Sequence, residues 1–243
     1  MANELPFFDD TEIQRVLCVV AHPDDMEYGG SAAVARWTAR GIDVAYLLLT
    51  AGEAGMRSRP PHEVAEVRRG EQEAACAAVG VDDLTILDFP DGMLEPTLAV
   101  REAIARQIRT FRPDVVCTQP WALEVAWGLN HADHRATGIA TVDAIRDADN
   151  PWVHRSLQQD EGLEPWGAKQ LLVFGGQDTQ LVDVSGLPLE QAIASLEAHE
   201  AYLDELGGLD ARGMLEGFTT DGAARGTDPK VTHAIGVEVH QMA

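Results

Sequence analysis

Two histidine–aspartate motifs contain the residues best suited to chemistry in this chain. The first, "AHPDD" at 21–25, places His22 beside two aspartates, Asp24 and Asp25, directly after an apolar run. Histidine and carboxylate are the usual ligands of a catalytic zinc ion, which keeps one position open for water. One aspartate could instead cap the helix that follows. A cap uses a single carboxylate, however, and leaves His22 and the second aspartate without a role.

The second motif, "HADH" at 131–134, places His131 and His134 on either side of Asp133. Two histidines three positions apart share a face if the segment is helical. Together with the first motif, His22, Asp25 and His134 would complete a three-ligand zinc site with an open position. The spacing by itself does not say which aspartate of the first motif is the ligand and which is a base.

The elements that must position these motifs alternate along the first half of the chain. The predicted strands are the apolar runs 15–21, 43–50, 84–89 and 114–119. The predicted helices are 31–40, 63–80 and 97–111. Strands buried on both faces and separated by helices predict an α/β, Rossmann-like layered fold with a mostly parallel sheet and helices on both faces. Both motifs follow predicted strands, at the carboxyl edge where ligands bind in such sheets.

The second half of the chain is less regular, and we interpret residues 1–243 as one domain. The further predicted elements are helices at 134–148 and 187–208 and strands at 170–176 and 231–240. Residues 149–168 are polar with scattered tryptophans and are interpreted as a loop or lid. Residues 209–229 are rich in glycine and charge and are interpreted as a mobile loop.

Composition excludes several classes of partner. The formal net charge of −22 repels phosphate backbones, so nucleic acid and anionic membranes are not expected partners. No apolar run approaches the roughly 20 residues of a membrane span, and the N-terminus does not resemble a signal peptide. The three cysteines form no CxxC pair, which argues against a disulfide framework. We therefore expect a cytoplasmic protein.

Five stretches occur in an order that resembles a known family. They are "AHPDDMEYGG" (21–30), "TAGEAG" (50–55), the R-x-x-E pair Arg68 and Glu71, "FPDGML" (89–94) and "HADH" (131–134). The chain resembles the GlcNAc-phosphatidylinositol de-N-acetylases, the PIG-L or LmbE-like family, over roughly residues 14 to 145. The resemblance implies a Rossmann-like fold and zinc-dependent hydrolysis of an acetamido group, usually on a glucosamine.

The resemblance also implies a role for each motif residue. The implied metal ligands are His22, Asp25 and His134. The implied catalytic residues are Asp24 as general base, His131 as the group that stabilises the oxyanion or protonates the leaving amine, and Asp133 as the group that orients the His131 ring.

Other residues admit a functional and a structural interpretation. The family places Arg68 and Asp91 at the substrate. The structural alternative for Arg68 is an exposed ion pair with Glu71, and that for Asp91 is a turn in "PDG".

Trp121 and Trp127 could stack on a sugar ring, although packing against the pocket wall is the commoner role. For His199 a structural role is the simpler interpretation. Leu129 departs from family members that carry a tyrosine there as an oxyanion donor.

The leading interpretation is therefore a Zn²⁺ enzyme, with Fe²⁺ as a possible metal, that removes an N-acetyl or other N-acyl group from an amino sugar or related small conjugate. One alternative keeps the site but changes the bond, as in an amidase for thiol conjugates or a deacylase acting on a natural-product intermediate. Another is a metal-binding protein without turnover. Family members are often homo-oligomers, so oligomerisation is possible here too.

Overall fold

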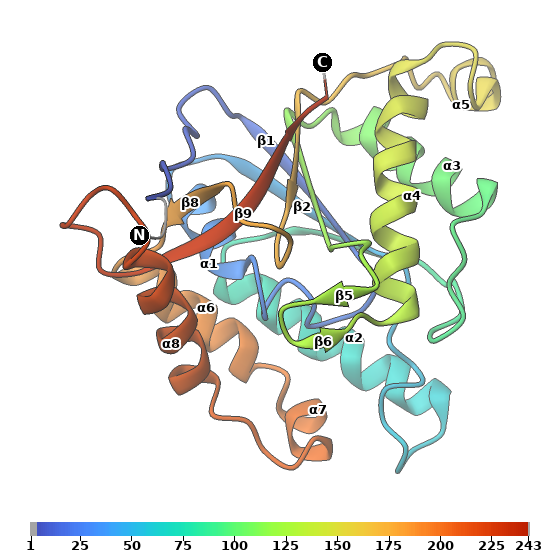
Figure 1. Ribbon diagram of the computed structural model, residues 1–243. Coiled ribbons are helices and arrows are strands. Elements are labelled where there is room, and N and C mark those ends of the chain that lie inside the picture. The colour runs from blue at the N-terminus through green and yellow to red at the C-terminus, as the bar shows by residue number, and fades with distance from the viewer. Residues whose placement is uncertain (1–3, 243) are drawn as a thin grey trace.

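A single seven-stranded sheet forms the centre of this computed structural model, which describes residues 4–242 (Figure 1). The strands of the sheet are β1 (Arg15–Val20), β2 (Asp43–Leu48), β3 (Asp83–Ile86), β4 (Val115–Thr118), β7 (Gln170–Val173), β8 (Gln180–Asp183) and β9 (Ala234–Gln241). A small hairpin follows β4 and consists of β5 (Glu124–Val125) and β6 (Gly128–Leu129). The helices are α1 (Ser31–Ala39), α2 (Pro61–Ala78), α3 (Leu98–Phe111), α4 (Ala132–Asp149), α5 (Arg155–Gln159), α6 (Leu187–Glu197), α7 (Glu200–Glu205) and α8 (Ala211–Ala223).

The order of strands across the sheet is β3-β2-β1-β4-β7-β9-β8. The first five are parallel, whereas β9 runs antiparallel to both β7 and β8. From β1 the chain builds the sheet outward in one direction through β2 and β3, and later in the other direction through β4. The carboxyl ends of β1 and β4 therefore flank the point where the strand order reverses, which is the usual ligand crevice of such folds.

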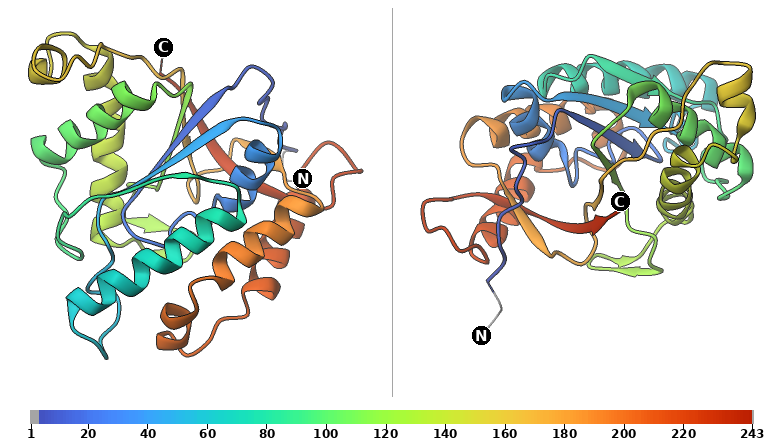
Figure 2. Two further views of the ribbon diagram at one scale, coloured as in Figure 1. Left: turned by 180° about the vertical axis from the view of Figure 1, so that it is seen from behind. Right: turned by 90° about the horizontal axis from the view of Figure 1, so that it is seen from above.

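Side chains of the central strands alternate between two hydrophobic cores. In β1, Val16, Cys18 and Val20 face one core, while Leu17 and Val19 face the other. The first core is covered by α1, α6 and α8, and the second by α3 and α4. Figure 2 shows these helices on opposite sides of the sheet. The expected mostly parallel sheet with helices on both faces is confirmed, because burial on both faces is what made these strands continuously apolar.

The predicted helix at 187–208 is interrupted in the structure. It divides into α6 and α7, and His199 lies at the break with its ring fully buried. Glu71 of α2 stabilises the start of α7, because its Oε1 accepts hydrogen bonds from the backbone N–H groups of Ala201 at 2.6 Å and Tyr202 at 3.4 Å. The helical periodicity was correct, but the break depends on a carboxylate from another helix.

The interpretation of 209–229 as a loop is wrong for 211–223, which form α8. Asp210 caps this helix by accepting a hydrogen bond from the backbone N–H of Gly213 at 2.9 Å. A Cβ at Gly222 would lie 2.9 Å from the carbonyl carbon of Ala234, so glycine there allows α8 to pack closely on β9. The glycines that suggested a loop thus include one required by packing.

The segment 149–168 contains α5 and lies at the carboxyl end of α4. Arg109, which is 1% exposed, holds it by donating hydrogen bonds to the carbonyls of Ala148 at 3.0 Å and Asn150 at 2.9 Å. The 18 residues of α4 span about 27 Å at 1.5 Å per residue. This segment, which was interpreted as a loop or lid, therefore lies far from the "HADH" motif at the opposite end of α4.

Two further observations bear on the sequence analysis. Cys18, Cys76 and Cys117 are buried free thiols, as expected for a chain without a disulfide framework. Within the described residues, every helix is too short or too polar to cross a bilayer.

Candidate metal centre and active site

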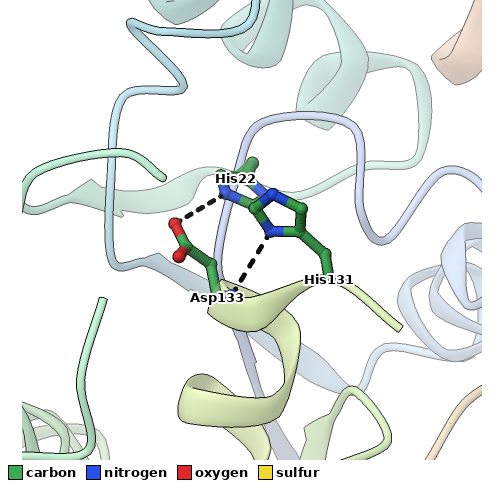
Figure 3. A group of neighbouring side chains, drawn as sticks. All are labelled: His22, His131 and Asp133. Carbon is green, nitrogen blue, oxygen red and sulfur yellow. Dashed lines mark hydrogen bonds and ion pairs between the residues drawn. The ribbon is translucent and has the colours of Figure 1, made fainter. Parts of the chain in front are cut away.

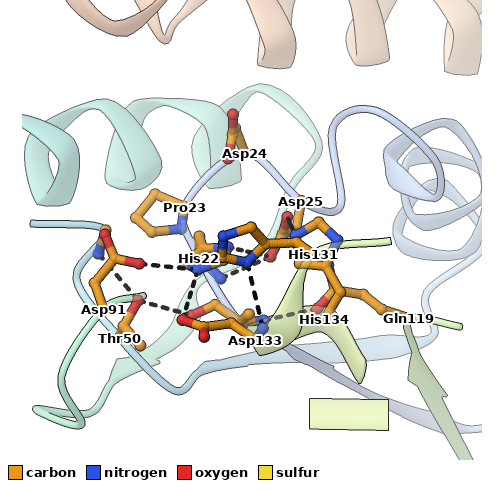
Figure 4. Close-up of polar contacts among 12 residues, drawn as sticks. His22, Pro23, Asp24, Asp25, Thr50, Asp91, Gln119, His131, Asp133 and His134 are labelled. Atoms are coloured by element: carbon orange, nitrogen blue, oxygen red, sulfur yellow. Dashed lines mark hydrogen bonds and ion pairs between the residues drawn. The ribbon is translucent and has the colours of Figure 1, made fainter. Parts of the chain in front are cut away.

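Both histidine–aspartate motifs lie at the crevice between β1 and β4. His22 follows the end of β1 by two residues, and its loop runs directly above the sheet (Figure 4). His131 is the N-cap residue of α4, so Asp133 and His134 belong to the first turn of that helix. The expected convergence of two segments that are distant in sequence is thus present, because the carboxyl ends of adjacent parallel strands meet at one edge.

Three side chains converge as the sequence predicted for a metal centre. Ligand atoms of His22, Asp25 and His134 all lie within 4.8 Å of one another. The Asp25 carboxylate stands between the two imidazoles, with Oδ2 3.4 Å from His22 Nδ1 and Oδ1 3.1 Å from His134 Nε2. A tetrahedral zinc with bonds of about 2.1 Å separates its ligand atoms by about 3.4 Å. The donor types and their spacing therefore fit a divalent cation.

The other nitrogen of His22 is held by two carboxylates. Nε2 lies 3.0 Å from Asp91 Oδ1 and 3.3 Å from Asp133 Oδ2. Carboxylates in this position fix the tautomer of a metal-binding histidine, because the proton stays on the nitrogen that they contact. With the proton held on Nε2, Nδ1 faces Asp25 and is the nitrogen whose lone pair can bind a metal.

Electrostatics favour a cation between these groups. Burial lowers the pKa of His22, but the charge of Asp25 and hydrogen bonds with Asp133, Asp25 and Asp91 outweigh it and raise the pKa well above its usual value. Burial raises the pKa of Asp25, but His134 and His22 lower it further, so the net shift is downward. Without a metal, protonated imidazole supplies the positive charge that these carboxylates require.

Asp133 is fully buried, and its carboxylate contacts different partners from those expected. It accepts hydrogen bonds from the backbone N–H groups of Gly92 at 2.7 Å and Leu94 at 3.1 Å, besides its contact with His22. The contact with His131 instead runs from the Asp133 backbone N–H to His131 Nδ1 at 3.3 Å, as Figure 3 shows. The carboxylate thus orients His22, and the backbone of the α4 N-terminus orients His131.

The surroundings of His131 favour its neutral form. Burial and the charge of His22 lower its pKa, and these effects outweigh the charge of Asp133. Because Nδ1 accepts a hydrogen bond, the ring proton of the neutral form is on Nε2. The ring packs edge-on against His22 with centroids 5.5 Å apart. The orientation of His131 that the resemblance assigned to Asp133 thus comes from the Asp133 backbone N–H and not from its carboxylate.

Asp24 is 5% exposed and is paired with Arg68 of α2. Arg68 Nη2 donates to Asp24 Oδ1 at 2.8 Å and to the carbonyl of Pro23 at 2.5 Å, and the Tyr202 ring stacks 3.8 Å from the guanidinium carbon. Figure 4 shows the Asp24 carboxylate pointing away from the ring of His22. Burial raises the pKa of Asp24 to about 7, although Arg68 opposes the shift.

The alternative interpretation of Arg68 as an exposed helical ion pair is wrong. Arg68 is 2% exposed and contacts the first motif, whereas Glu71 binds the start of α7. The Asp91 carboxylate also has a partner within the chain, since its Oδ2 accepts a hydrogen bond from the backbone N–H of Ala54 at 2.8 Å. Both predicted substrate-binding residues thus contact residues of the first motif, Arg68 at Pro23 and Asp24 and Asp91 at His22.

Asp24 also has an unusual backbone. Its φ of +83° lies in the left-handed region, which costs a residue other than glycine of order 1–3 kcal/mol. Gln72 of α2 contacts it there, since Gln72 Oε1 accepts a hydrogen bond from the Asp24 backbone N–H at 2.9 Å. Gln119 supports the same loop by accepting from the backbone N–H of Ala21 at 2.9 Å. Sequence reasoning missed both glutamines, and the spacing of Gln72 four residues after Arg68 was the available signal.

The remaining candidates are distributed as follows. Trp127 and Leu129 lie on the β5–β6 hairpin, with 62% and 74% of their surfaces exposed. Trp121 is half-buried and packs against the ring of His240. Burial and the charge of Arg68 lower the pKa of His199 to about 3, and neither of its ring nitrogens has a hydrogen-bond partner among the described residues.

Comparison with known proteins agrees with the site. The family model for PIG-L, GlcNAc-PI de-N-acetylase, matches residues 17–145, which include both motifs. A diacetylchitobiose deacetylase from Thermococcus kodakarensis is 32% identical over 204 residues, covering 82% of this chain and 73% of that protein. A 1D-myo-inositol 2-acetamido-2-deoxy-alpha-D-glucopyranoside deacetylase from Kineococcus radiotolerans is 34% identical over 250 residues, covering 76% and 68%.

The fold has a solved counterpart in N,N'-diacetylchitobiose deacetylase from Pyrococcus horikoshii. It superposes with a TM-score of 0.81, covering 96% of this chain and 85% of that one. At 22% identity this likeness concerns the fold alone. The family match spans more than half of the chain, and the Thermococcus relative matches over most of its length. The chain therefore belongs to the PIG-L, or LmbE-like, family of GlcNAc-PI de-N-acetylases and is a hydrolase of carbon–nitrogen bonds.

Proposed function

We propose that this chain removes the acetyl group from an N-acetylated amino sugar or sugar conjugate, using a divalent cation, Zn²⁺ or Fe²⁺, held by His22, Asp25 and His134. The observation that supports this most directly is the approach of their ligand atoms to within 4.8 Å of one another. The names of two relatives, a diacetylchitobiose deacetylase and a deacetylase of an inositol-linked acetamido sugar, support a sugar substrate.

The metal and the first motif supply the nucleophile in this proposal. A divalent cation held by these residues would lower the pKa of water toward neutrality and would polarise the acetyl carbonyl. Asp24 takes the proton of the attacking water as general base, a role that typically contributes roughly 10²–10⁴-fold. Arg68 engages Oδ1 of Asp24, so Oδ2 is the oxygen that takes the proton in this proposal.

His131 is proposed to stabilise the charge that develops on the acetyl oxygen. Its neutral ring carries the proton on Nε2, because Nδ1 accepts the Asp133 backbone N–H. A preorganised donor of this kind contributes most where water is excluded. A neutral imidazole has no spare proton to give away, so the proton that Asp24 takes from water is the one available for the leaving nitrogen. Acetate and a free amine are then released.

Arg68 and Asp91 are assigned orienting roles in this proposal. Arg68 is bonded to Asp24 and to the loop that contains it, and Asp91 fixes the proton on His22 Nε2. The family resemblance had placed both residues at the substrate. Both terminal nitrogens of Arg68 and both carboxylate oxygens of Asp91 already have partners within the chain. These contacts favour support of Asp24 and His22 over direct binding of the substrate.

The test is release of acetate and amine by the purified full-length chain. Protein loaded separately with Zn²⁺ or Fe²⁺ is incubated with N-acetylglucosamine, diacetylchitobiose, an inositol-linked N-acetylglucosamine and an acetylated thiol conjugate of the same sugar. We expect acetate and free amine in equal amounts from at least one of the sugars, loss of both on chelation, and recovery when metal is restored.

Two outcomes contradict the proposal. Protein that binds the metal in a one-to-one ratio but releases nothing from any substrate would be a metal-binding protein without turnover. Cleavage confined to the amide of the thiol conjugate, without acetate, would identify an amidase that uses the same site. The metal content, measured on the same samples, separates a failed loading from a failed reaction.

A further inference from the structure

The backbone of Asp24 is held on every side by hydrogen bonds. Its carbonyl accepts from the backbone N–H groups of Glu27 at 2.9 Å and Tyr28 at 3.3 Å, and its Oδ1 accepts from Arg68. The remaining polar group of its backbone is the N–H, which donates to Gln72 Oε1 at 2.9 Å. Among the described residues other than glycine, three have positive φ, and Asp24, at +83°, has the largest value.

Within the first motif, the Gln72 side chain contacts the backbone N–H of Asp24. It is 1% exposed and lies one helical turn after Arg68, so the two side chains of α2 extend side by side under the loop. Arg68 holds the carboxylate and the preceding carbonyl, whereas Gln72 holds the amide. Neither of these contacts could replace the other, because one partner donates and the other accepts.

The orientation of the Gln72 amide is determined by its neighbours. The Asp24 N–H is a donor, so the group that faces it must be the acceptor Oε1. Nε2 then donates to Glu27 Oε1 at 3.3 Å and contacts Cys76 Sγ at 3.6 Å. Glu27 also accepts from Ser195 Oγ at 3.2 Å, which anchors it from α6. A buried chain of hydrogen bonds thus links α6 through Glu27 and Gln72 to Asp24.

We propose that Gln72 is a positioning residue for catalysis, because its side-chain carbonyl holds Asp24 in the left-handed conformation from which the carboxylate can serve the reaction. This inference rests on the proposed function, in which Asp24 is the base. Without the acceptor, the peptide between Pro23 and Asp24 is free to rotate toward an ordinary backbone conformation. The carboxylate would then be displaced while the metal ligands keep their own supports.

A purely structural role for Gln72 makes a different prediction. A buried glutamine that only stabilises the fold would affect stability, and any loss of activity would be the same whether or not Asp24 can act as a base. A positioning residue acts through Asp24, so its effect should disappear when the base is removed. Coupled residues show this kind of non-additivity.

The experiment compares Gln72→Met with Ser195→Ala in the full-length, metal-loaded chain. Ser195 is equally buried and belongs to the same chain of hydrogen bonds, but it does not contact Asp24. A misplacement of about 1 Å can cost about 10²-fold in rate. We expect Gln72→Met to lower kcat about 10- to 100-fold, with an unchanged KM and unchanged metal content. Ser195→Ala should leave kcat within about twofold of the original chain.

Both substitutions are then repeated in an Asp24→Asn background. There Gln72→Met should change the residual kcat by less than about twofold. An unchanged kcat in the original chain, or the same fractional loss in both backgrounds, would overturn the proposal. Should Gln72→Met fail to fold, Gln72→Asn keeps the amide but withdraws it by about 1.5 Å. The shorter side chain should show the same loss, and full activity from it would also overturn the proposal.

Hydrogen exchange at the Asp24 amide tests the contact without any substrate. We expect exchange at least about tenfold faster in both Gln72 variants than in Ser195→Ala, because only the former lose the acceptor. Equal exchange in all of them would refute the contact. If the unmodified chain turned over no substrate, the proposed function would fail, while the exchange measurement would still report whether Gln72 holds Asp24.

Discussion

Replacing Arg68 by methionine should move the pH dependence of activity to higher pH. Asp24 must be ionised to act as a base, and burial raises its pKa to about 7 even with Arg68 in place. The guanidinium lies 2.8 Å from Oδ1, and the two groups are 2% and 7% exposed, so solvent screens the pair little. Arg68→Met removes the positive charge that favours the ionised carboxylate, which raises the pKa of Asp24 further.

The size of the shift follows from the geometry. At an effective dielectric constant of about 20 and about 4 Å between charge centres, such a pair is worth about 4 kcal/mol. One pKa unit corresponds to about 1.4 kcal/mol, so the acidic limb of the profile should move upward by about 3 units. Activity at neutral pH then falls by up to about 10³-fold, and it recovers as the pH is raised toward the new limb.

The assay is kcat/KM for acetate release as a function of pH, with metal content and Tm measured on the same protein. Arg68→Lys keeps a charge and should shift the limb less. Arg101→Met is the control, because Arg101 also pairs with a buried aspartate, Asp147, at 2.9 and 2.8 Å, but at the far end of α4. Arg101 is 27% exposed, so the loss of Arg101 should affect stability less than the loss of Arg68 affects activity. A loss of equal size at every pH, or a limb that stays in place, would refute the argument that Arg68 acts through the ionisation of Asp24.

Three further predictions follow from the same contacts. His134→Ala should lose the bound metal, whereas Asp24→Asn should keep the metal and lose roughly 10²–10⁴-fold in kcat. Metal analysis and turnover measurements on both variants check this, and an active Asp24→Asn would contradict the base assignment. Gly52→Ala should destabilise the chain by about 1 kcal/mol or more and lower kcat, since Gly52 has a φ of +65° and its new Cβ would stand 2.9 Å from Cζ of Arg68. Burial and the charge of Asp24 raise the pKa of Glu27 to about 8. The unfolded chain therefore releases the Glu27 proton at lower pH than the folded chain does. As a result, the stability of the metal-free protein falls as the pH rises from about 4.3 to about 8. Glu27→Gln should therefore gain Tm relative to the unmodified chain between about pH 5 and about pH 8, and a constant difference would argue against a protonated Glu27.

The Gly52 prediction has a control within the chain. Gly41 also has a positive φ, +79°, but a Cβ there would meet no atom within 4 Å. Gly41→Ala should therefore lower Tm through backbone strain alone and leave kcat unchanged. If both substitutions reduced kcat equally, the loss at Gly52 would have to come from global destabilisation and not from displacement of Arg68.

The first half of the fold was predictable from local sequence. Four apolar runs at 15–21, 43–50, 84–89 and 114–119 correspond to β1 to β4. The runs of β1, β2 and β4 are apolar throughout because these strands are buried on both faces, whereas β3 is an edge strand and is only partly buried. The second half was harder. The helix α8 carries glycines that resemble a loop, and the break at His199 depends on Glu71 of α2, so neither feature is encoded by its own segment alone.

The convergence of the two motifs was also predictable. Residues that follow adjacent parallel strands must meet at one edge of the sheet, and the two motifs each follow such a strand. The sequence thus indicated that His22, Asp25 and His134 would come together, and their ligand atoms do lie within 4.8 Å. Assigning Asp24 and Asp25 to different roles needed the family resemblance, since spacing treats neighbouring aspartates alike.

What only the tertiary structure decided is which groups support those side chains. The sequence by itself determined the layered architecture and the identity of the two motifs, because apolar periodicity and residue type are local properties. It did not determine that Asp133 holds His22, that the start of α4 orients His131, or that Arg68 and Gln72 of α2 hold Asp24. Hydrogen bonds at a fixed distance and direction join residues that are far apart in the chain, so they exist only once the helices have packed on the sheet.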